Sequence, residues 1–333
     1  MHAVRLHTFG PAENLTYETT DDPVPGPGQV RIAVAAAGVH LLDTALREGM
    51  TGPFPAPAEL PTVPGREVAG TVDMLGGSTD PALLGKRVVA HLGTAPGGYA
   101  ELAVTDAERI HRIPPALDEA EAVAMIGTGR TTLGILQFTD LGPDSIALVP
   151  AAAGGIGTLL VQYAKNAGAT VLGLAGGPAK TAAVRANGAD LAVDYTLPDW
   201  PRQVRAHLDG LGRRATVVYD SVGGVTGRAA VDLLGKGGQH IVFGWSGEGL
   251  HNGSPLTFTD EELAERGITS RSVLGTAMMQ KAGGLRVLEE RALAEAAAGR
   301  LRPAVQRFPL AAAAAAHRAL ETRGTMGKVV LVP

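Results

Sequence analysis

A glycine-rich turn in the middle of the chain has the residue types that hold a dinucleotide. It follows an apolar run, Ile146–Val149, that predicts a buried strand, and it reads Ala152-Ala153-Gly154-Gly155-Ile156-Gly157. Gly154 and Gly157 take the second and third places of the G-x-G-x-x-G pattern, where they let backbone approach a pyrophosphate and let a helix pack on a strand. The unpaired amides at the start of that helix favour an anion. Ala152 takes the first place, which suits such a site if its φ stays negative.

The residues after the next apolar run bear on which dinucleotide is bound. A site for NAD usually has Asp or Glu at the end of the second strand, where the carboxylate holds the ribose 2′-hydroxyl. Here that place reads Leu174-Ala175-Gly176-Gly177, and Lys180 follows on the first turn of the next predicted helix. A lysine suits a 2′-phosphate, so the sequence favours NADPH. The alternative is that Lys180 is a solvated surface lysine.

The length and the pattern of apolar runs predict an α/β protein of two domains. A chain of 333 residues is too long for one ordinary core. The first third has short β-branched runs between Gly and Pro, which indicates an antiparallel barrel or sandwich. From Ile146 onward strands alternate with helices, which is typical of a doubly wound parallel sheet. We expect residues 124–276 to form that sheet domain. Residues 1–123 and 277–333, which include the final strand KVVLVP, are expected to form the other domain.

Composition excludes several classes of function. The net charge is −4 and no run of Lys and Arg is present, so a nucleic-acid partner is not expected. The chain has no Cys, which excludes disulfides and thiolate chemistry and suits a reducing cytoplasm. The N-terminus lacks a signal-peptide pattern, and no apolar run is long enough to span a bilayer. We therefore expect a cytoplasmic protein that acts on a small molecule, away from membranes.

Stretches along the whole chain resemble a known family in their joint order and spacing. They read PGPGQVRIAVAAAGVHLLD, PGREVAGTV, GGYAELAV, AAAGGIGTLLVQYAKNAGA, GADLAVDY, VVYDSVGG and FPLAAAAAAHRALETRGTMGKVVLVP. The chain resembles the zinc-free medium-chain dehydrogenases/reductases, closest to the quinone oxidoreductase (zeta-crystallin-like) branch. The resemblance implies a GroES-like β-barrel catalytic domain, a Rossmann domain, NADPH as hydride donor and a homodimer.

The resemblance also implies roles for individual residues. Positions that match the cofactor contacts of the family are Gly154, Gly155, Ile156, Gly157, Lys180, Tyr195, Phe243, Gly244 and Arg323. Lys180 and Tyr195 match contacts to the 2′-phosphate, although a strand-end tyrosine also suits packing at a sheet edge. The glycine-rich turn matches the pyrophosphate contact, and Arg323 a basic contact to the cofactor phosphates. Thr131 and Phe243-Gly244 match residues that flank the nicotinamide.

Two motifs of the first third differ from those of the zinc alcohol dehydrogenases in the same superfamily. Those enzymes carry G-V-C-x-x-D and G-H-E-x-x-G, where this chain has His40 in place of the cysteine and Arg66 in place of the histidine. A guanidinium is always charged and cannot bind a metal. Because a catalytic zinc needs about three protein ligands, we expect no metal in this protein.

His40 is the candidate proton donor, with Asp43 beside it. It stands where quinone reductases of this type often have asparagine. An imidazole can donate to a substrate oxygen and deliver a proton near neutral pH. The equally weighted alternative is that His40 only hydrogen-bonds Asp43 or a nearby carbonyl and shapes the pocket. Asp43 is expected to orient its neighbour rather than to donate a proton.

The expected absence of a metal indicates the class of reaction. Without a Lewis acid, alcohol oxidation loses its main electrostatic help. A quinone or an enone accepts hydride more easily because the resulting negative charge is already delocalised. We therefore expect a metal-free, NADPH-dependent reductase of quinones or other α,β-unsaturated carbonyls that works by direct hydride transfer. The alternatives are an enoyl-thioester reductase acting on acyl-CoA or acyl-carrier protein, a non-catalytic NADPH-binding protein, and a zinc alcohol dehydrogenase.

Overall fold

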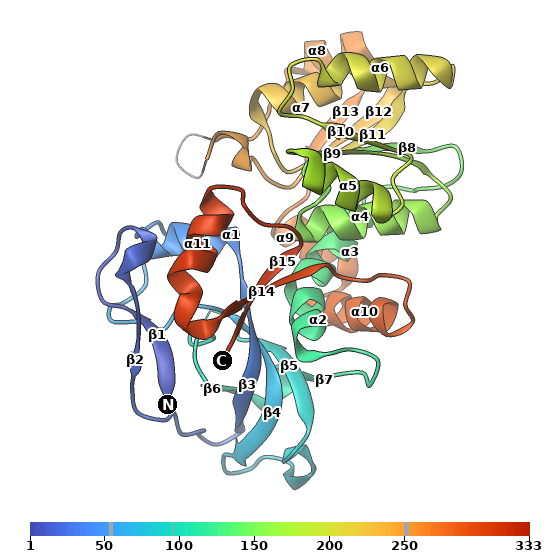
Figure 1. Cartoon of the computed structure of the whole chain (residues 1–333). Coiled ribbons are helices and arrows are strands. Elements are labelled where there is room, and N and C mark those ends of the chain that lie inside the picture. The colour runs from blue at the N-terminus through green and yellow to red at the C-terminus, as the bar shows by residue number, and fades with distance from the viewer. Residues whose placement is uncertain (53–55, 95, 250–252) are drawn as a thin grey trace. The chain divides into compact units, whose positions relative to one another are not determined.

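The computed structural model describes residues 1–52, 56–94, 96–249 and 253–333 and divides the chain into two compact units (Figure 1). The first unit consists of Met1–Gly129, Glu289–Gly299 and Pro303–Pro333. The second unit consists of Arg130–Leu288 and Arg300–Arg302. The C-terminal segment thus returns to the N-terminal unit. The domain boundaries expected from the sequence, after residues 123 and 276, stay predictions.

A parallel β-sheet forms the centre of the second unit. Its strands in sheet order are β10 (Leu191–Asp194), β9 (Thr170–Ala175), β8 (Ile146–Val149), β11 (Ala215–Asp220), β12 (Leu234–Val242) and β13 (Thr269–Ser272). Every neighbouring pair in this order is parallel. The chain leaves β8 in one direction through β9 to β10, and then crosses to β11 on the other side of β8. The doubly wound sheet predicted from the alternating pattern is therefore confirmed.

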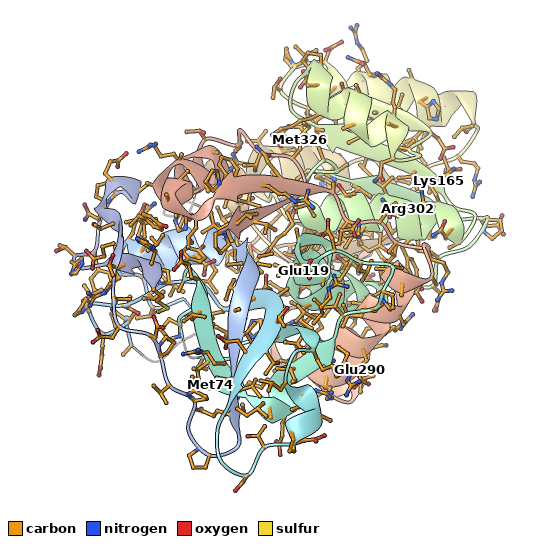
Figure 2. The ribbon with its side chains drawn as sticks, turned by 60° about the horizontal axis from the view of Figure 1, so that its bottom comes forward. Met74, Glu119, Lys165, Glu290, Arg302 and Met326 are labelled. Atoms are coloured by element: carbon orange, nitrogen blue, oxygen red, sulfur yellow. The ribbon has the colours of Figure 1, made fainter. Side chains whose placement is uncertain are left out.

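Helices cover both faces of this sheet. The helices of the second unit are α3 (Arg130–Leu136), α4 (Gly155–Asn166), α5 (Pro178–Ala186), α6 (Trp200–Gly210), α7 (Gly224–Val231), α8 (Asp260–Arg266) and α9 (Thr276–Ala282). In Figure 1, α4 and α5 lie on one face, and α6 and α7 on the other. Proline in the first turn of α5 and of α6 fits its fixed φ and its missing N–H. At the surface, the ammonium of Lys165 on α4 lies 2.8 Å from the carboxylate of Asp190 (Figure 2).

The first unit is built mainly from antiparallel strands. They are β1 (His2–Leu6), β2 (Leu15–Thr19), β3 (Gln29–Val39), β4 (Glu67–Leu75), β5 (Arg87–His91), β6 (Leu102–Asp106), β7 (Ile110–Arg112), β14 (Val305–Pro309) and β15 (Lys328–Val332). The main sheet has the order β14-β15-β3-β4-β5-β7, and β6 also pairs with β3. Only β14 and β15 are a parallel pair among the described strands of this sheet. The sequence predicted β15 but not β14, whose alternation is too short to stand out.

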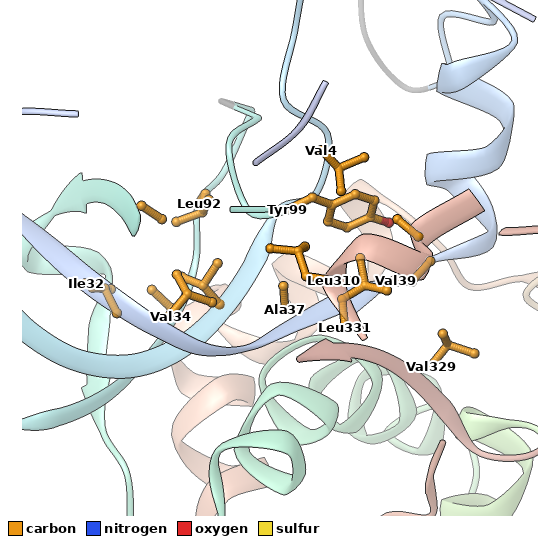
Figure 3. Close-up of a cluster of buried hydrophobic side chains, with 14 of the residues drawn as sticks. Val4, Ile32, Val34, Ala37, Val39, Leu92, Tyr99, Leu310, Val329 and Leu331 are labelled. Carbon is orange, nitrogen blue, oxygen red and sulfur yellow. The ribbon is translucent and has the colours of Figure 1, made fainter. Parts of the chain in front are cut away.

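The helices of the first unit flank this sheet. They are α1 (Leu41–Arg47), α2 (Glu119–Ala124), the part of α10 (Leu285–Ala297) from Glu289 onward, and α11 (Ala313–Glu321). The alanine run Ala311–Ala316 spans the end of a 3₁₀ turn and the start of α11. Figure 3 shows the buried core of the unit, where Val39, Tyr99 and Leu331 lie among apolar side chains from several strands. Within the described residues, no helix is long and apolar enough to cross a membrane.

Candidate active site

Three strands of the first unit bring charged side chains together that are far apart in the sequence. The antiparallel register pairs Val329 on β15 with Val39 on β3, so that Lys328 and His40 lie at adjoining strand ends. Glu67 begins β4, which is the neighbour of β3 on its other side. His40 follows the last residue of β3, Val39, and is the N-cap of α1. Strand pairing therefore gathers residues 40, 67 and 328 at one point.

These three side chains form a compact cluster, which we call the His40 cluster. The Nε2 atom of His40 lies 2.6 Å from Oε1 of Glu67 and 2.8 Å from Nζ of Lys328. The same Nζ atom lies 2.8 Å from Oε2 of Glu67. The side chains of Glu67 and Lys328 are 0% and 4% exposed, whereas that of His40 is 33% exposed. The imidazole is thus the member of the cluster that solvent or a ligand can reach.

The Glu67 carboxylate is ionised inside the protein because positive charge surrounds it. Burial raises its pKa, but the charges of His40 and Lys328, and to a smaller extent that of His91, hold that pKa well below its usual range. Glycine makes room for the carboxylate, since a Cβ on Gly38 or on Gly127 would overlap its oxygen atoms. The backbone around Glu67 is therefore shaped to admit a buried anion.

A second polar network lies beside the His40 cluster and is centred on Asp43. The backbone N–H of His40 donates to Oδ2 of Asp43 at 2.8 Å, which fixes the start of α1. The Tyr99 hydroxyl donates to the same oxygen atom at 3.1 Å and also lies 3.1 Å from Nε2 of His317. The guanidinium of Arg66 lies 3.5 Å from Oδ1. Asp43 thus holds the backbone of His40, which agrees with the expected orienting role but leaves that role a prediction.

Burial controls the ionisation of the groups that Asp43 touches. Burial, and then the negative charge of Asp43, raise the pKa of Tyr99 well above its ordinary value. Burial lowers the pKa of His317 from 6.5 to about 4, against the opposing influence of Asp43 and with help from Arg47. At neutral pH Tyr99 therefore keeps its proton and donates it to Asp43, and the uncharged His317 can donate its Nε2–H to the Tyr99 oxygen atom.

The two carboxylates near His40, those of Glu67 and Asp43, are not arranged to bind a divalent metal together with the imidazole. Both nearby carboxylates already face cations, Glu67 facing Lys328 and Asp43 facing Arg66. A metal bound to His40 Nε2 would lie against the Lys328 ammonium, whose like charge opposes it. In the part of the chain that the structure describes, no three His, Cys, Asp or Glu side chains are grouped to hold a metal ion. No catalytic step is assigned to a metal here.

In the second unit, the glycine-rich turn joins β8 to α4. Gly154 is the extended N-cap of α4 and supplies no side-chain cap, and the first amides of an α-helix have no partner within the helix. A Cβ on Gly157 would overlap the backbone of Ala151 and Ala152, so glycine is required for the helix to pack this closely. Positive φ occurs at Ala151, at 53°, and not at Ala152. The condition that the sequence set for alanine at 152 is thus met.

The end of β10 brings a carboxylate, which the sequence analysis did not consider, alongside the end of β9 that precedes Lys180. Lys180 is the third residue of α5 and is half-buried. Asp194 ends β10, and hydrogen bonds from Thr196 and from the N–H of Gly177 hold its pKa below the usual range. The search for an acid looked only at the end of the second strand, whereas parallel pairing brings the end of the third strand alongside. Tyr195 is half-buried and packs partly against the core of the unit.

The last parallel strands end in loops that are tied to each other. Buried Asp220, at the end of β11, accepts hydrogen bonds from the N–H groups of Val222 and Gly223 at 2.8 and 2.9 Å. The N–H of Phe243, which follows β12, donates to the carbonyl of Asp220. A Cβ on Gly244 would lie 3.0 Å from the carbonyl oxygen of Ser221, which leaves little room for a larger residue. These contacts hold Phe243 and Gly244 at the carboxyl edge of the sheet.

The predicted site residues therefore fall into two groups. The first group lies at the carboxyl ends of parallel strands in the second unit, which is where ligands bind in open α/β sheets. It consists of Gly154, Gly155, Ile156, Gly157, Lys180, Tyr195, Phe243 and Gly244. Thr131 belongs to the second unit too, on α3. His40, Asp43 and Arg323 belong to the first unit, Arg323 following α11 with φ of 57°.

The sequence analysis missed Lys328, Tyr99 and His317. Lys328 was counted only as the first residue of a strand, although a lysine beginning the buried run KVVLV is itself a signal for an internal partner. Tyr99 and His317 lie in the stretches GGYAELAV and FPLAAAAAAHRALETRGTMGKVVLVP, but nothing in either stretch indicates a contact between the two residues. Their partners come from packing of distant segments.

Sequence comparisons agree with this architecture. A profile described as an alcohol dehydrogenase GroES-like domain matches residues 26–115, and one described as a zinc-binding dehydrogenase matches residues 155–290. The first match covers strands of the first unit, and the second begins within the glycine-rich turn and covers the strands β9 to β13 of the parallel sheet. The predicted combination of a GroES-like domain and a Rossmann-type sheet is confirmed.

Full-length relatives define the family more closely. A quinone oxidoreductase of Pseudomonas aeruginosa is 32% identical over 334 residues, with 99% of each chain covered. A 2-haloacrylate reductase of a Burkholderia species is 32% identical over 338 residues, covering 99% of this chain and 98% of the relative. The crystal structure of Escherichia coli quinone oxidoreductase complexed with NADPH superposes with a TM-score of 0.84 at 27% identity and covers all of both chains. This chain belongs to the medium-chain dehydrogenase/reductase family, in the branch that contains the quinone oxidoreductases.

Proposed function

We propose that this protein is an NADPH-dependent reductase of quinones or other α,β-unsaturated carbonyls. The observation that carries the proposal is the His40 cluster, in which a reachable imidazole is held between a buried anion and a buried cation. Such a group can hold and release a proton. The names of the relatives, a quinone oxidoreductase and a 2-haloacrylate reductase, point to the same kind of acceptor.

The carboxyl edge of the parallel sheet supports NADPH as the cofactor. The amides at the start of α4 would hold the pyrophosphate, and Lys180 and Tyr195 would hold the 2′-phosphate. Asp194 does not oppose this assignment, because its carboxylate is bound to Thr196 and to the N–H of Gly177. When bound, the cofactor supplies the hydride. A relative of known structure carries NADPH.

Individual residues would position the reactants. Phe243, Gly244 and Thr131 would flank the nicotinamide, and Arg323 would contact the cofactor phosphates. His40 would hydrogen-bond the acceptor oxygen and give it a proton, while Asp43 holds the backbone of His40 at 2.8 Å. A positioned acid of this kind typically contributes a rate factor of about 10² to 10⁴.

The donor set of the His40 cluster favours conjugated acceptors over simple alcohols. The ammonium of Lys328 and the guanidinium of Arg66 are paired with the two carboxylates that a metal ion would need as ligands. A quinone or enone needs less help, since its own conjugation spreads the charge that hydride brings. The protein then has to align the acceptor and offer a donor to one oxygen. A homodimer and a cytoplasmic location stay predictions.

The experiment is a side-by-side measurement of NADPH oxidation with phenanthrenequinone, an alkenal and crotonyl-CoA. We expect kcat/KM for the quinone or the alkenal to exceed that for crotonyl-CoA by about tenfold or more. The reverse order would identify an enoyl-thioester reductase. Tight NADPH binding without turnover of any acceptor would identify a non-catalytic binding protein.

A further inference from the structure

The His40 cluster has more partners than a fixed histidine needs. The Nε2 atom has either one proton or one lone pair, so it can donate or accept, but not both. Glu67 at 2.6 Å can only accept, and the Lys328 ammonium at 2.8 Å can only donate. Protonated Nε2 can therefore donate to Glu67, and deprotonated Nε2 can accept from Lys328.

Because an acceptor and a donor both contact Nε2, the partly buried ring can gain or lose a proton without leaving Nε2 without a hydrogen-bond partner. If Nε2 carries a proton, the Glu67 carboxylate stabilises it. If Nε2 is bare, it accepts from Lys328. In both states Lys328 keeps its contact to Glu67 at 2.8 Å, so that neither buried charge is left alone.

The two buried charges also act in opposite directions on the ring. A carboxylate near an imidazole favours the charged form, and an ammonium disfavours it. The distances from Nε2, 2.6 and 2.8 Å, are nearly equal, so the two influences are of similar size. Without Lys328, Glu67 would keep the imidazolium in an ion pair. Without Glu67, Lys328 would drive the proton away.

Other charged groups around the ring are held elsewhere. Asp43, on α1, accepts from the backbone N–H of His40 and faces Arg66 and Tyr99. His91, at the end of β5, faces Glu67. The opposed pair at Nε2 therefore consists of Glu67 from β4 and Lys328 from β15.

We propose that Glu67 and Lys328 are opposed positioning residues that set the pH at which His40 releases its proton, a role that rests on the proposed reductase function where it concerns the acceptor. In this step an N–H bond of the ring breaks and an O–H bond forms on the acceptor oxygen, which carries the negative charge left by hydride addition. His40 passes from imidazolium to neutral imidazole, and water returns the proton at its exposed edge.

The test compares Lys328→Met, Glu67→Gln and the double variant by NMR titration of the His40 ring, identified by its loss in His40→Gln. Lys328→Met should move the midpoint of the titration to higher pH by about one unit or more, and Glu67→Gln should move it to lower pH by a similar amount. The double variant should return close to the wild type. Lys165→Met, which removes a surface ion pair of the other unit, is the matched control and should leave the midpoint unchanged.

These titrations need neither cofactor nor acceptor, so they test the charge opposition apart from the reductase function. Shifts in one direction only, or no shift, would overturn the proposal. If a single variant fails to fold, a double variant whose midpoint moves by about one unit or more would overturn it as well. The pH profile of kcat/KM should move with the ring in each variant. Opposed NMR shifts with an unmoved profile would leave the opposition intact and contradict His40 as the proton donor in the proposed function.

Discussion

The two candidate regions are built from different materials. At the edge of the parallel sheet, the start of α4 presents backbone amides on a turn whose shape depends on Gly154 and Gly157. At the His40 cluster, by contrast, the working parts are side chains, and both Glu67 and Lys328 are almost fully buried. The first kind of site is local in sequence, and the second exists only after strands far apart have paired.

This difference predicts where each region is vulnerable. Buried ions depend on each other, so that losing one partner leaves an uncompensated charge in a medium that solvates it poorly. A turn that offers amides to solvent has no such dependence. We expect mutations at the His40 cluster to affect stability and proton transfer, and mutations at the sheet edge to affect cofactor affinity alone.

The largest expected effect is on rate. His40→Gln keeps a hydrogen-bonding group but cannot deliver a proton, so kcat/KM for the quinone should fall by about 10²- to 10⁴-fold. The KM for NADPH should stay as in the wild type. Steady-state kinetics with varied acceptor and varied NADPH measures both. Unchanged kcat/KM in this variant would remove His40 from the reaction.

Lys328→Met should lower the free energy of unfolding by about 3–5 kcal/mol, because it leaves the buried Glu67 carboxylate without its cation. Adding Glu67→Gln should recover most of the loss. Lys165→Met is the control from the other unit, and its exposed pair with Asp190 should cost about 0–1 kcal/mol. Chemical denaturation measures the free energy of unfolding of these three variants and of the wild type. Equal losses for Lys328 and Lys165 would erase the distinction between the two regions.

The buried network beside the cluster should make stability depend on pH. His317 has its pKa lowered from 6.5 to about 4, so the unfolded chain binds this proton at a higher pH than the native one. The free energy of unfolding should therefore fall as pH drops between these values, by about 3 kcal/mol in total, and this contribution should be constant above them. Denaturation at several pH values measures the slope. His317→Gln should flatten it, and an equally steep slope in that variant would assign the effect to other groups.

The smallest expected effect is at the sheet edge. Lys180→Ala should raise the KM for NADPH by about tenfold or more, since a charged contact to phosphate is lost. The KM for NADH and the unfolding free energy should change little. Lys165→Ala, on the neighbouring helix α4, is the control. Equal changes for both cofactors would place Lys180 outside the 2′-phosphate site.

How far the sequence predicted these regions follows from their construction. The turn, Lys180 and the parallel sheet were predictable from neighbouring residues in the sequence. The spacing of apolar residues, the spacing of glycines and the order of strands and helices can all be seen within short stretches. Lys328 was not, since its role depends on the register that sets Val329 against Val39. Asp194 was missed for a similar reason, as it reaches Gly177 from the next strand. A charged residue that begins a buried apolar strand is the signal that would have pointed to Lys328.

The most direct test of the account is NADPH-dependent quinone reduction by protein that has been exhaustively chelated, with its metal content measured in parallel. The claim is that ion pairs occupy the His40 position in place of a metal. Activity should then be the same before and after chelation. Loss of activity on chelation, recovery with zinc, and about one zinc per chain would contradict it.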